Sequence, residues 1–391
     1  MPRPRHTQSG FTVKSVLVTL VVFVAAVGAL LYALDYTNIF TGEYKRSAGD
    51  KNVATDLAKA ADAIVNTAVA APVLNFADYD SRMFALAHRT SSSTIATTTV
   101  KVKVGTTTVS EIATSTKTYL WPAKTVYPNV GAILPFKRIV AYYGNFYSTG
   151  MGVLGEYPEA QMLAMLASTT AEWAAADPNT PVVPGIDYIA VTAQGSPGAD
   201  GKYRLRMPDS QIDYALQLAA KVNGVVILDV QVGLSNLQTE LPLLQKYLSM
   251  PQVELAIDPE FAMHNGEKPG SAIGSFDATD VNYAANYLKG LVDANNLPPK
   301  VLIVHRFTED MVTNPQNIKP LPEVQVVMDM DGWGSPAKKT NTYEQVIEAE
   351  PVQFTGFKLF YKNDILPPST RMMTPAEVLA LTPSPVFIQY Q

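Results

Sequence analysis

Residues 253–261 read VELAIDPEF, a short apolar run that ends in two acidic residues. The run VELAI predicts a buried strand. Because side chains two positions apart on an extended chain point to the same side, we expect Asp258 and Glu260 to present two carboxylates to one site. Pro259 between them fits a strand end, where no backbone donor is needed. Such a pair can serve acid/base chemistry, although carboxylates at strand ends also occur as plain structure.

Similar apolar runs recur on both sides of this stretch and alternate with segments of helical periodicity. Eight runs begin at residues 139, 186, 225, 253, 300, 324, 354 and 386. The helical segments cover residues 159–176, 209–222, 237–249, 279–295, 336–348 and 375–381. This alternation predicts an α/β protein with a (β/α)8 TIM barrel over residues 138–391. A doubly wound open sheet is the alternative, but no glycine-rich phosphate-binding turn follows the first run.

The amino-terminal part of the chain predicts a membrane anchor. Arg3, Arg5 and Lys14 precede the uncharged run SVLVTLVVFVAAVGALLYAL at residues 15–34, which has the length of a transmembrane helix. Positive residues favour the cytoplasmic side, so residues 1–14 are expected to be a cytoplasmic tail of a single-pass cell-membrane protein whose later part is extracytoplasmic. Secretion after signal cleavage is the alternative, although the run is longer than the usual signal core.

Residues 35–137 are expected to connect this anchor to the barrel. The sequence DKNVATDLAKAADAIVNTAV at residues 50–69 predicts a short amphipathic helix. Residues 89–118 are rich in Thr, Ser and Val. Two β-branched stretches flank Gly105 and predict a β-hairpin, with a flexible or glycosylated linker as the alternative.

The composition excludes several classes of function. The 391 residues carry a formal net charge of −5, without the basic surplus typical of nucleic-acid binding, so we do not expect a nucleic-acid partner. The chain contains no cysteine, which rules out disulfides, thiol nucleophiles and cysteine-bound zinc. A hydrophobic fraction of 47% is enough for the large core that a barrel needs.

Polar residues gather where the predicted strands end, which is where barrels of this type build their sites. The third and sixth runs repeat the spacing of Asp258 and Glu260, with an acid followed two positions later by an amide or acid. Ionised carboxylates are costly to bury unless they are paired, so their concentration at one mouth indicates a site, although any one of them alone is more often structural. The expected substrate-contacting residues are Tyr142, Asn145, Gln194, Asp229, Gln231, His305, Arg306, Asp331, Trp333, Lys358 and Tyr361.

Three functions fit these residues. A glycoside hydrolase would use Glu260 as the proton donor, with Asp258 or Asp329 as second carboxylate, no cofactor, and a cell-wall or other polysaccharide or oligosaccharide as substrate. Aromatic residues at the strand ends, including Tyr143, would then stack on sugar rings. A carbohydrate-binding barrel without turnover is an alternative. A metal-dependent hydrolase is another, in which Mg²⁺, Mn²⁺ or Ca²⁺ would be held by Asp229, Asp258, Glu260, His305 and Asp329.

Two resemblances accompany these predictions. The ending Asp258-Pro259-Glu260 resembles the fourth-strand ending of chitinase-type and Chalaropsis-type lysozyme barrels, which implies a catalytic role for Glu260. In place of the longer acidic run of chitinases, this chain has LAI. Over a longer span, the segments AYYGN, GVLGE, LDVQVG, LAIDPEF, IGSFDATDVN, VHRFTEDMV, DMDGWGSP and GFKLFY resemble a group of secreted or membrane-attached barrel proteins without an established reaction. That resemblance implies the barrel fold and an extracytoplasmic location.

Overall fold

The computed structural model describes residues 73–90, 95–104, 107–116 and 119–391. The predicted cytoplasmic tail, the membrane anchor at residues 15–34 and the helix at residues 50–69 lie outside these residues. Within the described ranges, none of the helices combines the length and the apolar character needed to cross a membrane. The compact unit that contains the barrel runs from Pro72 to Gln391, so it begins well before the first barrel strand.

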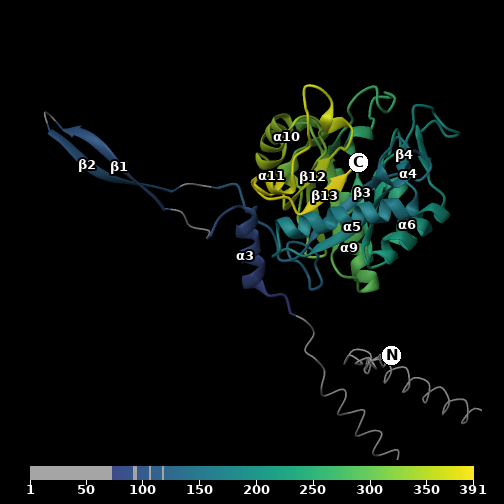
Figure 1. Cartoon of the computed structure of the whole chain (residues 1–391), viewed down its shortest axis with the longest axis horizontal. Helices are drawn as coiled ribbons and strands as arrows, with labels where there is room; N and C mark the ends of the chain where they lie inside the picture. The colour runs from purple at the N-terminus through teal and green to yellow at the C-terminus, as the bar shows by residue number, and fades with distance from the viewer. Residues whose placement is uncertain (1–72, 91–94, 105–106, 117–118) are drawn as a thin grey trace, which may run out of the picture. The chain divides into compact units, whose positions relative to one another are not determined.

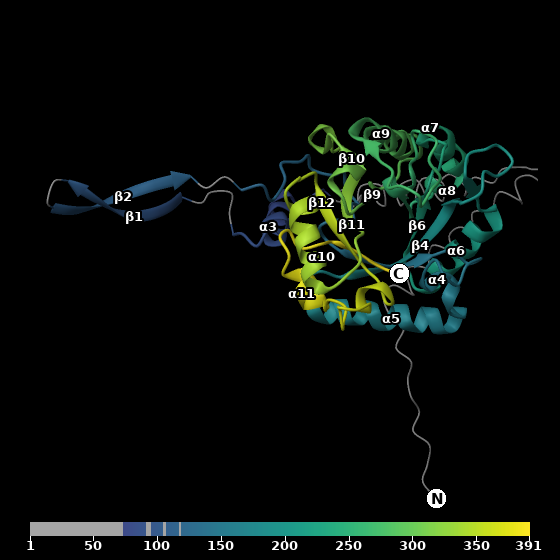
Figure 2. The same cartoon turned by 90° about the horizontal axis from the view of Figure 1, so that it is seen from above.

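Eight parallel strands close into a barrel (Figures 1 and 2). They are β3 (Arg138–Gly144), β4 (Val182–Ala193), β6 (Val225–Val230), β7 (Val253–Ile257), β9 (Lys300–Arg306), β11 (Val324–Met330), β12 (Phe354–Leu359) and β13 (Phe387–Tyr390). Each strand pairs in parallel with the next one along the chain, and β13 pairs with β3 to close the ring. The predicted (β/α)8 barrel is therefore confirmed, and the open-sheet alternative is wrong.

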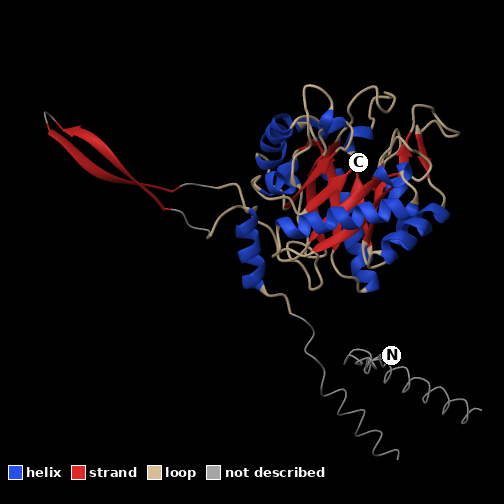
Figure 3. Cartoon of the chain, viewed as in Figure 1, coloured by secondary structure: helices blue, strands red, loops and turns tan. Residues whose placement is uncertain are grey.

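Helices surround the strands (Figures 2 and 3). They are α4 (Val153–Glu156), α5 (Glu159–Ala176), α6 (Asp209–Lys221), α7 (Leu237–Glu240), η1 (Leu241–Leu244), α8 (Gln245–Leu248), α9 (Ala278–Asn295), α10 (Pro336–Thr342) with its π-helical continuation η5 (Tyr343–Glu348), and α11 (Pro375–Leu379). Side-chain caps fix several starts: Asp277 accepts from the Thr279 amide and Thr374 from the Glu377 amide. Such caps satisfy backbone donors that have no partner inside the helix.

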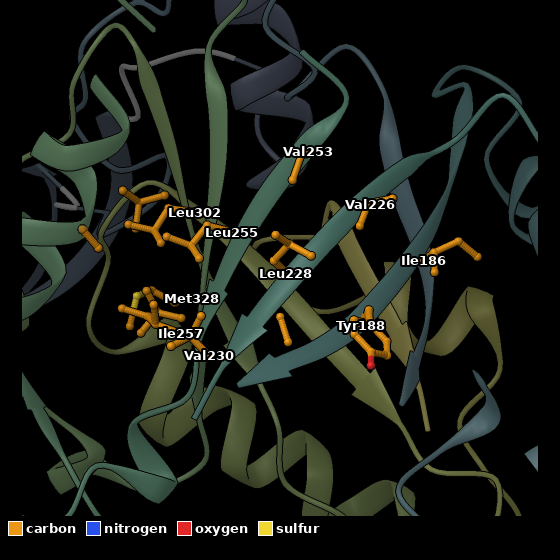
Figure 4. Close-up of a cluster of buried hydrophobic side chains, with 14 of the residues drawn as sticks. Ile186, Tyr188, Val226, Leu228, Val230, Val253, Leu255, Ile257, Leu302 and Met328 are labelled. Atoms are coloured by element: carbon orange, nitrogen blue, oxygen red, sulfur yellow. The ribbon is translucent and has the colours of Figure 1, made fainter. Parts of the chain in front are cut away.

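The outward-pointing strand residues form the main core between the strands and the helices. Leu228 and Val230 of β6 and Leu255 and Ile257 of β7 belong to it and are fully buried (Figure 4). Burying an aliphatic side chain of this size contributes roughly 1.5–3 kcal/mol, so this layer supplies much of the stability. Because strand residues alternate, the neighbouring positions must face the inside of the barrel.

Inside the barrel, the amino-terminal half is mainly apolar, with Glu254 and Gln325 as buried polar exceptions. Ile227, Ala256, Ile303 and Val327 are fully buried in a second cluster, which also includes Tyr79 and Met83 of the helix α3 (Phe76–Leu86). The helix α3 thus packs against the amino-terminal end of the barrel interior. The site must therefore lie at the opposite, carboxyl end.

Short elements complete the described chain. The strands β1 (Ile95–Val104) and β2 (Thr107–Thr116) pair antiparallel, in the stretch where the sequence left a hairpin and a linker open. The other elements are β5 (Arg204–Arg206), η2 (Pro259–Phe261), β8 (Phe276–Asp277), η3 (Glu309–Met311), β10 (Val312–Thr313), η4 (Pro315–Asn317) and η6 (Asn363–Ile365). β5 lies antiparallel on the end of β4 and extends the sheet beyond the ring there.

Candidate active site

A pocket of about 490 Å³ opens at the carboxyl ends of the strands. Seven of the residues that we predicted from the sequence line it: Tyr143, Gln231, Asp258, Glu260, Asp331, Trp333 and Lys358. The apolar residues Met151, Ile189, Phe261, Phe307 and Phe360 line the rest of its wall, among others. Apolar walls with a few convergent polar groups are typical of ligand-binding sites.

Asp258 and Glu260 line this pocket from a turn that follows β7. The strand stops at Ile257, and Asp258 caps the one-turn helix η2 by accepting a hydrogen bond from the Glu260 amide at 3.1 Å. Pro259 fits the first helical position, because proline needs no amide donor there. Both carboxyl groups therefore reach the pocket, but the extended geometry that we expected for them is wrong.

Burial sets the protonation of this pair. Asp258 is almost completely buried, and this burial raises the pKa of its carboxyl well above the ordinary value. Burial, and secondarily the charge of Asp331, also raises the pKa of Glu260. The Gln231 amide donates a hydrogen bond to Asp258 Oδ2 at 3.3 Å and thereby holds its side chain. Carboxyl groups with raised pKa values in a pocket are candidates for proton transfer.

Asp331 and Lys358 form an ion pair on the pocket wall. Lys358 Nζ lies 3.0 Å from Asp331 Oδ1 and 4.0 Å from the centre of the Tyr143 ring. Burial alone would lower the pKa of Lys358, but Asp331 and Asp258 raise it above its ordinary value. The site therefore carries a fixed positive charge held between a carboxylate and an aromatic face, an arrangement that favours the cation.

Beneath the pocket lies a buried polar layer, which we define as Asp187, Asp229, His305, Asp329 and Gln389. The His305 ring lies between two of its carboxylates: Nδ1 is 3.2 Å from Asp329 Oδ2, and Nε2 is 3.9 Å from Asp229 Oδ2. These distances are those of ion pairs rather than aligned hydrogen bonds. Burial alone would lower the pKa of His305, but the surrounding carboxylates raise it to about 10, so the ring is a cation at neutral pH.

The layer is linked to the pocket wall by direct contacts. Tyr143 donates a hydrogen bond to Asp229 Oδ2 at 2.8 Å, and Gln231 donates to the Tyr143 hydroxyl at 3.1 Å. His305 Nδ1 also lies 3.3 Å from Asp331 Oδ2. Burial raises the pKa values of Asp229 and of the other acids in the layer. Asp229, His305 and Asp329 are fully buried and do not line the pocket.

One glycine makes room for this layer. Gly356 faces the inside of the barrel on β12, next to β11. A Cβ atom at this position would collide with the Asp329 carboxylate. Glycine is unfavourable inside a strand, and where it occurs it often allows another group to come close to the backbone. Here the approaching group is a buried carboxylate.

Three of the predicted site residues point away from the pocket. Tyr142 faces outward, where its hydroxyl lies 2.8 Å from Thr169 Oγ1 of α5 and 3.0 Å from the Tyr361 hydroxyl. Tyr361 belongs to this same cluster behind the barrel wall. Arg306 also faces outward and donates to the carbonyls of Glu309 and Val312. These three residues therefore stabilise the packing around the barrel, and the predicted contact of each with substrate is not supported.

Two further predicted residues organise loops. Asn145 is buried and donates through Nδ2 to the Ile189 carbonyl at 3.1 Å, which ties the loop after β3 to β4. Gln194 follows β4, and its backbone amide donates to the Tyr203 carbonyl. Neither residue lines the pocket.

Asp187 belongs to the site region but was missed in the sequence. We expected the second strand to begin at residue 186, whereas β4 begins at Val182. Asp187 therefore lies in the middle of a strand, where its Oδ2 accepts a hydrogen bond from Gln389 at 2.6 Å. Burial, followed by the charge of Asp229, raises the pKa of Asp187 to about 8. The signal was the alternation of Val183, Gly185 and Asp187, which fixes the inward face.

The four acids and one histidine of the metal alternative are not grouped as ligands of one ion. Among the described residues, no group of three or more His, Asp or Glu side chains is arranged to hold an ion. The physical reason is the position of His305, whose ring fills the space between Asp229 and Asp329. A protonated imidazole supplies the positive charge that a metal ion would supply.

Comparison with known proteins adds little to this geometry. No family model matches the sequence, and no curated protein sequence matches it. Among solved structures, the chain is similar to a xyloglucan-specific endo-β-1,4-glucanase of glycoside hydrolase family 5 from a metagenomic library, crystallised with cellotriose. The identity is 12%, the match covers 66% of this chain and 87% of that one, and the TM-score is 0.34. A likeness of this size carries no argument about activity.

Proposed function

We propose that this protein is a glycoside-hydrolase-like barrel that acts on a polysaccharide or oligosaccharide by carboxylate acid/base catalysis, with Glu260 as the proton donor. The observation that carries the proposal is the position of Glu260 on the wall of a 490 Å³ pocket, with a pKa raised by burial and by Asp331. A glycosidic oxygen is a poor leaving group unless it is protonated, and an acid whose pKa is raised holds its proton to higher pH and can donate it to that oxygen.

Asp331 is the second carboxylate that we assign to the reaction, in place of Asp329. It lines the pocket together with Glu260, whereas Asp329 is fully buried below it. The Lys358 ammonium group lies 3.0 Å from Asp331 Oδ1 and pairs with it. An ionised carboxylate can stabilise the positive charge that develops on the sugar ring in the transition state. Asp258, whose pKa is raised well above the ordinary value, instead positions the η2 turn that carries Glu260.

The exposure of Trp333 beside the pocket favours a carbohydrate as the ligand. It lines the pocket and leaves 48% of its surface exposed, which is unusual for such a large apolar side chain. Lys338 Nζ lies 4.8 Å from its ring centre and covers part of it. An exposed aromatic face beside a pocket of polar groups suits the apolar face of a sugar ring.

The test is the substitution Glu260→Gln in the full-length protein. A panel of cell-wall and storage polysaccharides is assayed for new reducing ends. We expect Glu260→Gln to lower kcat by roughly 10²–10⁴, the usual contribution of a general acid, with the melting temperature unchanged. Glu309→Gln is the matched control, because Glu309 is exposed on the loop after β9 and does not line the pocket.

Each other outcome has a defined meaning. Equal activity of Glu260→Gln and the wild type contradicts the assignment of the proton donor. Oligosaccharide binding without any turnover in the wild type contradicts catalysis and favours the carbohydrate-binding alternative. Loss of turnover on treatment with EDTA, restored by one divalent cation, contradicts catalysis by carboxylates alone.

We further propose that the barrel acts outside the cell membrane and is held there by residues 15–34. The uncharged run at these positions and the basic residues before it support this location. A chain lacking residues 1–34 is expected in the soluble fraction, whereas the full-length chain is expected in the membrane fraction after carbonate washing. A full-length chain that leaves the membrane under this wash contradicts a spanning anchor.

A further inference from the structure

Behind the pocket wall lies a buried ion pair that the proposed mechanism does not use. Lys339 Nζ of α10 is 2.6 Å from Asp364 Oδ2 of η6, and both side chains are about 99% buried or more. Neither residue lines the pocket. We name Lys339 and Asp364 the clamp pair. Breaking such a buried pair is costly, but an apolar pair of similar volume often serves stability as well, so the charges call for another explanation.

The clamp pair connects the segments that carry one side of the pocket. Asp364 Oδ1 accepts a hydrogen bond from the Gly334 amide at 2.9 Å, directly after Trp333. Asp364 Oδ2 accepts another from the Phe360 amide at 3.0 Å. Lys339 Nζ donates to the carbonyl of Lys358 at 2.7 Å. One carboxylate and one ammonium group thus hold the loop after β11, the helix α10 and the end of β12 together.

These backbone contacts fix pocket residues on both sides of the pair. The loop after β11 supplies Trp333, and the end of β12 supplies Lys358 and Phe360 to the pocket wall. Three hydrogen bonds to the backbone and the bond between Lys339 and Asp364 are all buried. They leave the two side chains almost no freedom to change conformation. The clamp pair, which lies behind the pocket wall, consequently fixes the distance between the Trp333 ring and the Lys358–Asp331 ion pair.

We propose that Lys339 and Asp364 are positioning residues that set the spacing between the exposed Trp333 face and the Lys358–Asp331 pair, and hence the grip of the pocket on a sugar. This inference rests on the proposed function for its ligand class, a saccharide with an apolar ring face and several hydroxyl groups. Its geometric part, the placement of Trp333, does not depend on catalysis.

Asp364→Asn in the full-length protein tests the pair, because it keeps the shape and removes the charge. Lys339→Met is the second variant, since its side chain can pack against Phe357 and Phe360, whose ring centres both lie 5.1 Å from Nζ. The matched control is Glu240→Gln. Glu240 is also fully buried and pairs with Arg204 at 2.8 Å, but neither of these two residues lines the pocket.

Tryptophan fluorescence reports the geometry. The chain has three tryptophans, of which Trp121 and Trp173 are buried, so acrylamide quenching reports mainly on Trp333. We expect stronger quenching in Asp364→Asn and Lys339→Met, and unchanged quenching in Glu240→Gln even where its melting temperature falls. For a saccharide that the wild type cleaves, we expect KM to rise about tenfold or more in the two clamp variants with kcat changed less than about threefold, the pattern of lost ground-state positioning.

The outcomes separate this inference from the proposed function. Wild-type quenching and wild-type KM in both clamp variants overturn the positioning role, whatever the melting temperatures show. The same holds if Glu240→Gln changes quenching and KM as much as the clamp variants do. If the wild type neither binds nor cleaves any saccharide, the proposed function fails, and the quenching comparison alone decides whether the pair positions Trp333. If Asp364→Asn does not fold, Lys339→Met decides.

Discussion

The two halves of the barrel interior share the same strands but differ in chemistry. In the amino-terminal half the inward positions hold Ile227, Ala256, Ile303 and Val327. Two residues further along each strand, the inward positions hold Asp229, Asp258, His305 and Asp329, all buried. The backbone geometry is continuous across this change. The apolar half stabilises the fold, while the polar half concentrates charge where a ligand can meet it.

The contrast between the two halves shows that the buried charges of the site lower the local stability of the barrel relative to an apolar interior. Burial of apolar groups is favourable without any partner, whereas each buried carboxylate needs a proton, a cation or donors. In the polar half these come from His305, Lys358 and Tyr143. The polar half should therefore respond to loss of a cation and to pH. The apolar positions of the other half should respond only to loss of volume, and Glu254 is the titrating exception among them.

The largest effect is expected when the cation of the buried polar layer is removed. His305→Gln leaves Asp229 and Asp329 without the positive charge that lies 3.9 Å and 3.2 Å from them. We expect the free energy of unfolding at pH 7 to fall by about 3–5 kcal/mol, the cost of breaking a buried pair. Urea unfolding measures this change. His264→Gln, at an exposed histidine, is the control and should change stability by less than about 0.5 kcal/mol.

A second comparison uses pH. Asp187 has a pKa of about 8 in the folded protein against an ordinary value of 3.8, so folding takes up a proton between these values. Stability is therefore expected to fall as the pH rises from about 4 to 8, by up to about 1.4 kcal/mol per pH unit for this one group. Glu254, with a pKa raised to about 7, contributes in the same direction. His305 continues the decline from pH 6.5 to about 10, because its raised pKa favours the folded state only while the ring keeps its proton.

Asp187→Asn isolates this contribution, because asparagine resembles the protonated acid. Urea unfolding at several pH values between 5 and 8 should show a flatter dependence in this variant than in the wild type. Parallel curves for the two proteins would mean that Asp187 is ionised in the folded state and that its charge is balanced there.

The smallest effect is expected in the apolar half. Ile303→Val removes one buried methylene group two residues before His305 on β9. We expect a loss of about 0.5–1.5 kcal/mol at every pH, because no charge is involved. Chemical unfolding of the wild type and the variant at pH 5 and pH 8 measures this loss of stability. A loss that differs between the two pH values would contradict the distinction between the two halves.

The sequence predicts the architecture closely because periodicity reports burial. The helix predicted at residues 159–176 is α5, and the strand runs beginning at residues 225, 253 and 300 coincide with the starts of β6, β7 and β9. Apolar and helical periods carry this information residue by residue. The closure of the ring follows from the number and order of the strands.

The site was less predictable, because side chains alternate along a strand and the sequence does not show which alternate set points into the barrel. At the end of β3 the sequence offers Tyr142 and Tyr143, and nothing in their chemistry tells which one points inward. The structure brings Tyr143 to the pocket and packs Tyr142 against α5. At the ends of β6 and β7, Asp229 and Asp258 mark the polar face, and Asp258 and Gln231, which directly follow these strands, were predicted correctly.

The clamp pair shows a second reason. Lys339 and Asp364 lie in segments that look like ordinary surface helix and loop, and charged residues there are usually solvated. Their burial results from contacts between segments 25 residues apart in sequence. Local patterns carry no trace of such contacts.

The space beside Gly356, which the Asp329 carboxylate fills, couples these two positions of the chain. A side chain at residue 356 and a carboxylate at residue 329 compete for the same volume. During divergence these positions are therefore expected to change together: alanine at position 356 displaces the Asp329 carboxylate and favours a residue smaller than aspartate at position 329. Relatives with that exchange would keep the strand, which gains about 0.5–1 kcal/mol from losing glycine, and would forfeit the acid that holds His305. Covariation at this pair would thus separate descendants that retain the charged interior from those that keep only the scaffold.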